Sequence, residues 1–247
     1  MSLYLSSKDP GPFDIIGDVH GCFDELHALL ILLGYKIEKN GFYCVTHPMG
    51  RKVIFVGDLV DRGPKIPEVL RLVMDMIASH VAYCVRGNHD DKLRRALKGN
   101  KVKISHGLEE SLAQLATQPP VFKHEVLQFL ENLVYYYIFD QGKLVVAHAG
   151  IKEKDIGSDT LYIKSFCLYG ETSNEIDAQG FPVRHPWMND YHGEALIVYG
   201  HTAILAPEWV NNTICIDSGC VFGGRLTALR YPEKILVSVS GYKGYKS

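Results

Sequence analysis

The chain lacks the features that mark membrane, secreted and polyanion-binding proteins. No stretch of its 247 residues approaches the roughly 18 unbroken apolar residues of a membrane-spanning helix. The N-terminal stretch MSLYLSSKDP lacks the charged and apolar regions of a signal peptide, so we expect a cytoplasmic protein. The formal net charge is only −2, which gives no global electrostatic reason to bind a polyanion or an acidic membrane.

Paired cysteines are also absent. The six cysteines are scattered along the chain, several lie inside apolar runs, and none forms a CxxC pair. In a cytosolic protein of this size such cysteines are expected to be buried small hydrophobic residues. This pattern disfavours a disulfide framework and a cysteine-based zinc site.

The length and composition are those of one globular domain. Hydrophobic residues make up 47% of the chain and charged residues 22%, which suits one substantial core and is short for two. No internal repeat, low-complexity tract or linker divides the sequence. We therefore expect a single domain over residues 1–247, with its core at about 13–240.

One stretch, residues 53–64, stands out: VIFVGDLVDRGP. Residues 53–56 are apolar on both alternating faces, which is typical of a strand covered on both sides of a sheet. The run stops at Gly57 and is followed at once by Asp58, Asp61 and Arg62. Ligands in α/β sheets gather beyond the carboxyl ends of the strands, so this loop is expected at a functional site.

The rest of the chain alternates strand and helix patterns. Local patterns alone suggest a doubly wound sheet, because most strands are followed by helical spacing. Hairpins are expected at 35–45 and 135–147, and residues 106–133 are expected to be helical with a break at 119–120. Residues 151–194 are rich in glycine and poorly periodic, which predicts an irregular, lid-like segment. Strands are expected at 13–16, 53–56, 81–85, 144–147, 195–199, 213–216, 225–230 and 235–239.

Six of the apolar runs stop at residues that can bind metals. A single histidine is more often structural than a ligand, and Asp18 alone could cap the helix that follows it. Recurrence at six strand ends is hard to attribute to chance, and it would bring oxygen and imidazole donors to a common edge, as in a dinuclear metal site. The residues are Asp18 and His20, Asp58, Asn88, His148, His201 and, with a weaker pattern, Asp217.

Five motifs in order give the chain a family resemblance. GDVHG at 17–21, GDLVDRG at 57–63, GNHD at 87–90, AHAG at 147–150 and GHT at 200–202 resemble the motifs of the calcineurin-like metallophosphoesterases, in the phosphoprotein phosphatase branch. The tail, residues 216–233, is similar to small bacterial PrpE-type enzymes and to the phosphatase module of bacterial polynucleotide kinase-phosphatases. The resemblance implies a mixed α/β (α+β) fold, a β-sandwich flanked by helices, instead of a doubly wound sheet.

The resemblance also implies a ligand set for two divalent metal ions. Asp18 and His20 would hold the first metal and Asp58 would bridge both. The second metal would be held by Asn88, His148 and His201. Oxygen and nitrogen donors without thiolates suit Mn(II), Fe or Zn, of which we expect Mn(II).

Further roles follow from the same motifs. His89 resembles the general acid for the leaving oxygen, and Asp61 would orient it. Arg62 is expected to hold the substrate phosphate, with Arg86 and Arg184 as further candidates. Asp217 and Asp90 are expected to support the ligands from behind, although the branch often has glutamate where this chain has Asp90.

The resemblance leaves several substrates open. PrpE-type relatives imply hydrolysis of dinucleoside tetraphosphates or of phosphoserine and phosphothreonine in proteins. The other relatives imply a phosphate at a polynucleotide end, but the chain has no GxxxxGK[ST] kinase loop, so that role would be standalone or with a partner. Trp187, in the irregular segment, is a candidate for stacking on a nucleobase.

A binding module without catalysis is the alternative from another class, since fold does not fix function. Such a module would be expected to keep the ligands and lose the groups that act on the substrate. His89, Asp61 and Arg62 are all present. We therefore expect an enzyme, a metal-dependent hydrolase of phosphoric esters or anhydrides.

Overall fold

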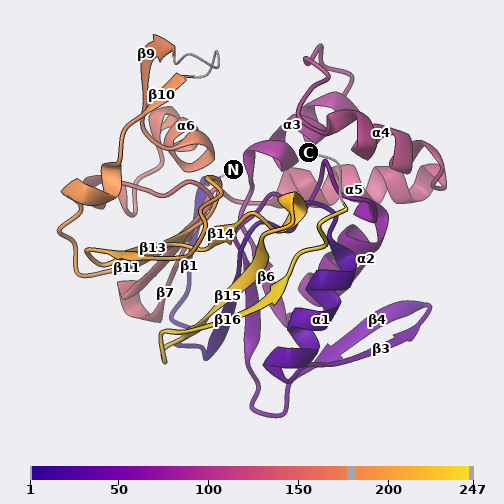
Figure 1. The fold of residues 1–247 in the computed structure, drawn as a ribbon, viewed down its shortest axis with the longest axis horizontal. Coiled ribbons are helices and arrows are strands. Elements are labelled where there is room, and N and C mark those ends of the chain that lie inside the picture. Colours follow the sequence, from indigo (N-terminus) through magenta and orange to yellow (C-terminus); the bar gives the residue numbers. More distant parts are fainter. Residues whose placement is uncertain (1, 177–181, 245–247) are drawn as a thin grey trace.

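Two six-stranded sheets lie at the centre of the computed structural model, which describes residues 2–176 and 182–244 (Figure 1). The first sheet runs β1 (Tyr4–Ser6), β7 (Tyr136–Phe139), β8 (Leu144–Ala147), β11 (Leu196–Tyr199), β13 (Thr213–Cys215) and β12 (Trp209–Val210). The second runs β14 (Asp217–Ser218), β15 (Arg225–Tyr231), β2 (Phe13–Ile16), β5 (Lys52–Phe55) and β6 (Ala82–Cys84), with β16 (Ile235–Ser240) beside β15.

Alternation along each central strand explains why the sheets pack face to face. In β5 and the residue after it, Ile54 and Val56 belong to a core cluster built from both sheets, whereas Val53 and Phe55 point into the cluster under the helices. Successive strand side chains point to opposite faces, so a strand that is apolar throughout is buried on both sides. The sandwich implied by the resemblance is confirmed, and the doubly wound alternative is wrong.

Helices cover the outer faces of both sheets. Helices α1 to α5 belong to the core cluster on the outer face of the second sheet, in which α4 and α5 pack on α2 and α3, and α6 packs on the first sheet through Ile163, Phe166 and Cys167. The helices are α1 (Phe23–Leu33), α2 (Ile66–Ala78), α3 (Asn88–Leu97), α4 (Leu108–Ala116), α5 (Pro120–Asn132) and α6 (Leu161–Tyr169). The short 3-10 segments are η1 (Asp140–Gly142), η2 (Glu153–Asp155), η3 (Trp187–Asp190) and η4 (Cys220–Phe222).

The remaining strands form two hairpins outside the sandwich. The first consists of β3 (Lys36–Asn40) and β4 (Phe42–Thr46), close to the predicted 35–45. The second consists of β9 (Thr172–Ile176) and β10 (Pro182–Arg184) and stands above α6 in Figure 1. Residues 177–181, between its strands, lie outside the described residues.

The expectation of an irregular segment at 151–194 is corrected by the structure. The segment contains α6 and the β9–β10 hairpin as well as short turns. Residues 163, 166 and 167 of α6 have helical spacing, but the exposed Leu161, Tyr162 and Tyr169 hide that pattern in the sequence. Residues 106–133 form α4 and α5 with the break where it was predicted, and both helices pack into the core under the second sheet.

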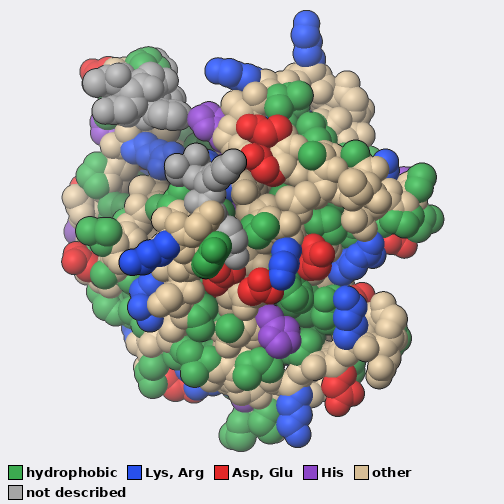
Figure 2. Space-filling model, turned by 45° about the vertical axis from the view of Figure 1, so that its right-hand side comes forward, with side chains coloured by type: hydrophobic (Ala, Val, Ile, Leu, Met, Phe, Trp, Pro, Cys, Tyr) green, Lys and Arg blue, Asp and Glu red, His purple; other side chains and the backbone are tan. Residues whose placement is uncertain are grey.

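The surface carries both signs of charge. Side chains of Lys and Arg are interspersed with those of Asp and Glu on the face drawn in Figure 2. Within residues 2–176 and 182–244, no helix has both the length and the apolar character needed to cross a membrane.

A buried ion cluster that the sequence did not reveal ties the second sheet together. Asp14 of β2 is fully buried. Its carboxylate accepts hydrogen bonds from Arg51 Nε at 3.1 Å, from Arg230 Nε at 3.1 Å and from the Tyr35 hydroxyl at 3.0 Å. Arg51 also pairs with Glu233 at 2.8 Å. The cluster therefore connects β2 to β15, and both strands to Tyr35, Arg51 and Glu233 in the connecting segments.

Removing Asp14 is expected to destabilise the protein strongly. Asp14→Ala leaves the buried Arg51 guanidinium short of a partner, and breaking a buried pair typically costs about 3 to 5 kcal/mol. Chemical denaturation measures the loss. Asp24→Ala is the matched control, because Asp24 pairs with Lys65 at the surface and its removal should change the midpoint little. Equal losses in the two variants would contradict this account of the cluster.

Candidate metal centre and active site

The strand ends of both sheets meet at one edge of the sandwich. Asp18 and His20 follow β2, and Asp58 follows β5. His148 and His201 follow β8 and β11 of the other sheet. Loops from two sheets therefore supply donors to one place, as the sequence predicted.

Three lone-pair donors crowd together on one side of Asp58. His148 Nε2 lies 2.9 Å from Asn88 Oδ1 and 3.1 Å from His201 Nδ1, and the last two atoms are 2.8 Å apart. His148 Nδ1 donates to the Val56 carbonyl at 2.9 Å, which leaves the lone pair on Nε2. Burial lowers the pKa of His148 to about 3, so its imidazole is neutral. Such a cluster of acceptors fits a bound cation.

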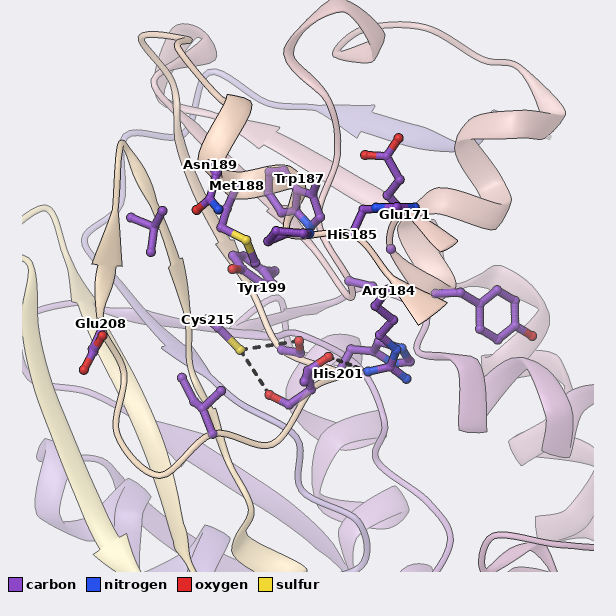
Figure 3. Close-up of a pocket in the computed structure, with 18 of the residues that line it drawn as sticks. Glu171, Arg184, His185, Trp187, Met188, Asn189, Tyr199, His201, Glu208 and Cys215 are labelled. Carbon is purple, nitrogen blue, oxygen red and sulfur yellow. Dashed lines mark hydrogen bonds between the residues drawn. The ribbon is translucent and has the colours of Figure 1, made fainter. Parts of the chain in front are cut away.

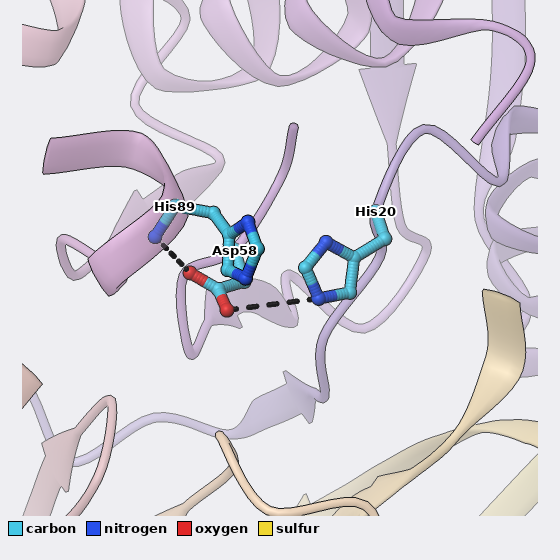
Figure 4. A group of neighbouring side chains, drawn as sticks. All are labelled: His20, Asp58 and His89. Carbon is cyan, nitrogen blue, oxygen red and sulfur yellow. Dashed lines mark hydrogen bonds and ion pairs between the residues drawn. The ribbon is translucent and has the colours of Figure 1, made fainter. Parts of the chain in front are cut away.

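A second group of donors includes His20, which lies beside Asp58 in Figure 4. His20 Nε2 is 3.6 Å from Asp58 Oδ2, and His148 Nε2 is 3.4 Å from the same oxygen. His20 Nδ1 donates to the Val60 carbonyl at 2.7 Å, so its Nε2 is also free to bind a metal. The one carboxylate of Asp58 is therefore shared by both groups.

The carboxylates of this centre crowd one another. Burial, followed by the nearby charge of Asp217, raises the pKa of Asp18 well above its usual value. Burial, followed by the charge of Asp90, does the same to the pKa of Asp58. Divalent cations would offset this repulsion, so the donor set fits two metal ions chemically.

Two glycines allow the carboxylates to lie against the strand-end loops. A Cβ at Gly87 would come within 2.1 Å of Asp58 Oδ1, and a Cβ at Gly200 within 2.0 Å of Asp18 Oδ1. Any larger residue at either position would push the carboxylate out of place. The glycines of the GNHD and GHT motifs thus have a steric role.

Backbone strain is concentrated in the same loops. Positive φ angles occur at five non-glycine residues of the site, from 45° at His20 to 73° at His201, with Asp58, Asp61 and Arg62 between them. Such conformations cost about 1 to 3 kcal/mol each and persist where the surroundings impose them.

Asp90 holds the Asp58 loop in its strained shape. Its buried carboxylate accepts hydrogen bonds from the backbone N–H groups of Asp58, Leu59 and Gly87 at 2.8, 3.0 and 2.9 Å. The aspartate length suits this position, since one carboxylate reaches all three donors. Asp90 therefore lies behind Asp58, in the supporting position that the sequence predicted.

His89 and Asp61 form a buried pair at the edge of the centre. His89 Nδ1 lies 2.6 Å from Asp61 Oδ2. The other Asp61 oxygen accepts a hydrogen bond from Ser111 of α4. Burial raises the pKa of Asp61 to about 7 and lowers the pKa of His89 to about 3. Ser111 gave no signal in the sequence, because a serine on a helix face has no motif around it.

The three candidate arginines do not share a location. Arg62 and Arg184 line a cavity of about 520 Å³ over the donors, and Arg184 Nη1 also donates to Thr202. Arg86 lies elsewhere, and its prediction as a phosphate ligand is wrong. Its guanidinium donates to the carbonyls of Leu130 and Glu131 at 2.8 and 3.0 Å, and so satisfies the C-terminal end of α5.

Comparison with known proteins decides the family. The model of the calcineurin-like phosphoesterase family matches residues 11–238 of the chain. The chain belongs to the calcineurin-like phosphoesterase family. The prediction made from the five motifs is therefore confirmed.

Several relatives of this calcineurin-like phosphoesterase match nearly its whole length. It is 46% identical over 237 residues to the protein named bis(5'-nucleosyl)-tetraphosphatase PrpE [asymmetrical] of Anoxybacillus flavithermus, with 94% of this chain and 96% of that one covered. It is 47% identical to the protein of the same name from Bacillus subtilis, with 92% and 93% covered. A crystal structure of a protein provisionally named a diadenosine tetraphosphatase superposes with a TM-score of 0.72 at 27% identity, covering 99% and 100%.

The phosphoesterase should gain stability when it is loaded with metal. A ligand that binds only the folded state stabilises it by about 2.7 kcal/mol at a hundred times its Kd. We expect Mn(II) to raise the Tm of the chelator-stripped protein, as measured by scanning calorimetry. Asn88→Ala removes one oxygen of the crowded cluster, so it should lose much of this gain while the Tm of its stripped form changes little.

His124→Ala is the matched control for that experiment. His124 is an exposed histidine on α5, away from the donors, so its variant should keep the full gain. An equal metal-induced gain in Asn88→Ala and the wild type would rule out Asn88 as a ligand.

Proposed function

We propose that the chain is a dinuclear metal-dependent hydrolase that cleaves bis(5'-nucleosyl) tetraphosphates asymmetrically, into a nucleoside triphosphate and a nucleoside monophosphate. The shared Asp58 between two groups of neutral, metal-ready donors carries the proposal. Relatives that match more than nine-tenths of the chain bear this activity in their names. The substrate in those names is a nucleotide, and its phosphates would suit Arg62 and Arg184, which line the cavity over the donors.

The chain's own residues fit two metal ions. Asp18, His20 and Asp58 would hold one ion, and Asn88, His148 and His201 would join Asp58 around the other. We propose Mn(II) for both positions, because the donors are oxygen and imidazole without thiolate. Bound there, the ions would supply an acidified water and screen the charge of the phosphate under attack.

Two arginines are the residues that we propose hold the polyphosphate. Arg62 and Arg184 come from different parts of the chain and line the same cavity as the donors. Arg62 Nε is buried and has no hydrogen-bond partner among the described residues, and its guanidinium stacks over the Phe222 ring at 5.1 Å. A phosphate oxygen is a suitable partner for such a group.

His89 is the residue that we propose delivers a proton to the leaving oxygen. It lines the donor cavity, and Asp61 fixes its ring through Nδ1. Burial raises the pKa of Asp61 to about 7, which favours sharing of a proton between Asp61 and His89. That proton can pass through the imidazole to a departing phosphate oxygen.

Product analysis tests the proposed activity. The Mn(II)-loaded protein should convert diadenosine tetraphosphate into ATP and AMP, resolved by ion-exchange chromatography. Two molecules of ADP would contradict asymmetric cleavage. Faster release of phosphate from a phosphothreonine peptide or from a 3'-phosphorylated oligonucleotide would instead assign the chain to the other substrates considered.

The role of His89 predicts a dependence on the leaving group. His89→Asn should lower kcat for the dinucleotide by about 10²- to 10⁴-fold, which is the usual contribution of general acid catalysis. The loss should be larger for phenyl phosphate than for p-nitrophenyl phosphate, because phenolate is the more basic leaving group and depends more on a proton donor. Asp61→Asn should show the same selectivity. Equal losses on the two aryl phosphates, with metal content unchanged, would contradict the proton-donor role.

A further inference from the structure

A second cavity opens beside the metal centre (Figure 3). Its volume is about 790 Å³, within the range of roughly 300 to 1,000 Å³ typical of small-ligand sites. Tyr169, Arg184 and His201 line both this cavity and the one over the donors. A single ligand lying across these three residues would therefore enter both cavities.

The walls of the second cavity are chemically unlike the metal centre. One wall is the chain from His185 to Asn189, which includes most of η3, and a second is formed by Tyr199 and Cys215 on the outer face of the first sheet. The third consists of loop residues that include Leu205 and Ala206. Most of this lining is apolar or aromatic, and its polar groups include Asn189, His185 and the carboxylates of Glu171 and Glu208.

Trp187 has a different role from the one predicted. It is only 6% exposed, and its ring packs against Phe166, Tyr191 and Tyr199. The indole is thus part of the wall and not a free stacking platform. Leu205, by contrast, is fully exposed at the mouth of the cavity, where a bound ligand would cover it.

We propose that the second cavity binds a nucleoside of the substrate, with the purine base against the apolar walls and the phosphates passing over Arg184 toward the metal centre. The inference rests on the proposed function and adds where the base is recognised. The required ligand is anionic at one end and flat and apolar at the other, and a nucleotide has both properties. The polar edge of the base then faces the few polar groups, among them Asn189 and His185.

A pair of matched ligands tests the proposal. AMP and ribose 5-phosphate differ only in the base, and both can be titrated calorimetrically into the Mn(II)-loaded protein. We expect AMP to bind at least tenfold more tightly than ribose 5-phosphate. Equal affinities would overturn the proposal.

A cavity-filling variant locates the site of that difference. Ala206→Trp places an indole in the cavity from an exposed loop, away from the metal ligands. It should reduce the affinity for AMP to that for ribose 5-phosphate and leave ribose 5-phosphate binding unchanged, which also shows that the variant is folded. Ala206→Ser is the control and should bind AMP as the wild type does. Unchanged AMP binding in Ala206→Trp, or an equal loss for both ligands, would contradict the proposed base site.

Turnover separates this inference from the proposed function. If the wild type does not cleave the dinucleotide but still prefers AMP in a manner that Ala206→Trp abolishes, the proposed function fails and the nucleoside site stands. If the wild type cleaves the dinucleotide and shows no preference for AMP, the proposed function stands and the nucleoside site fails.

Discussion

The Asp58 carboxylate is the constraint on which the rest of the site depends. It follows a strand of one sheet, touches imidazoles that follow strands of both sheets, and is held in a left-handed conformation by its neighbours. Three backbone N–H bonds to Asp90 and the missing side chain of Gly87 keep it there. The buried carboxylates repel one another, and the lone pairs of Asn88, His148 and His201 crowd together. Bound cations would offset both repulsions.

The sandwich supplies the rigidity that this arrangement needs. Strands that are buried on both faces cannot slide without moving the core clusters on either side, so their ends are fixed in space. The loops supply the side chains of the site, and the sheets fix where those loops lie. Helix α4 adds Ser111 behind Asp61, and so connects the helical layer to the His89–Asp61 pair.

Much of this site was predictable because local sequence patterns determine it. An apolar run that stops at a glycine and an acid, as at Gly57 and Asp58, indicates the end of a strand. Five short motifs in order then identified the family. Arg86 was misassigned because its partners, the end carbonyls of α5, are more than forty residues away in sequence. The cluster around Asp14 was missed for the same reason, since Arg230 and Glu233 come from the far end of the chain. The apolar cavity is likewise built from segments that carry no common motif.

The central proposal is that the Asp58 carboxylate would join two metal ions at the meeting point of the sheets. Electron paramagnetic resonance of the protein saturated with Mn(II) tests it most directly, because two ions that share a carboxylate at about 3.5 to 4 Å are magnetically coupled. We predict two Mn(II) per chain and the multiline spectrum of a coupled pair. The six-line spectrum of isolated Mn(II) at saturation would contradict the account.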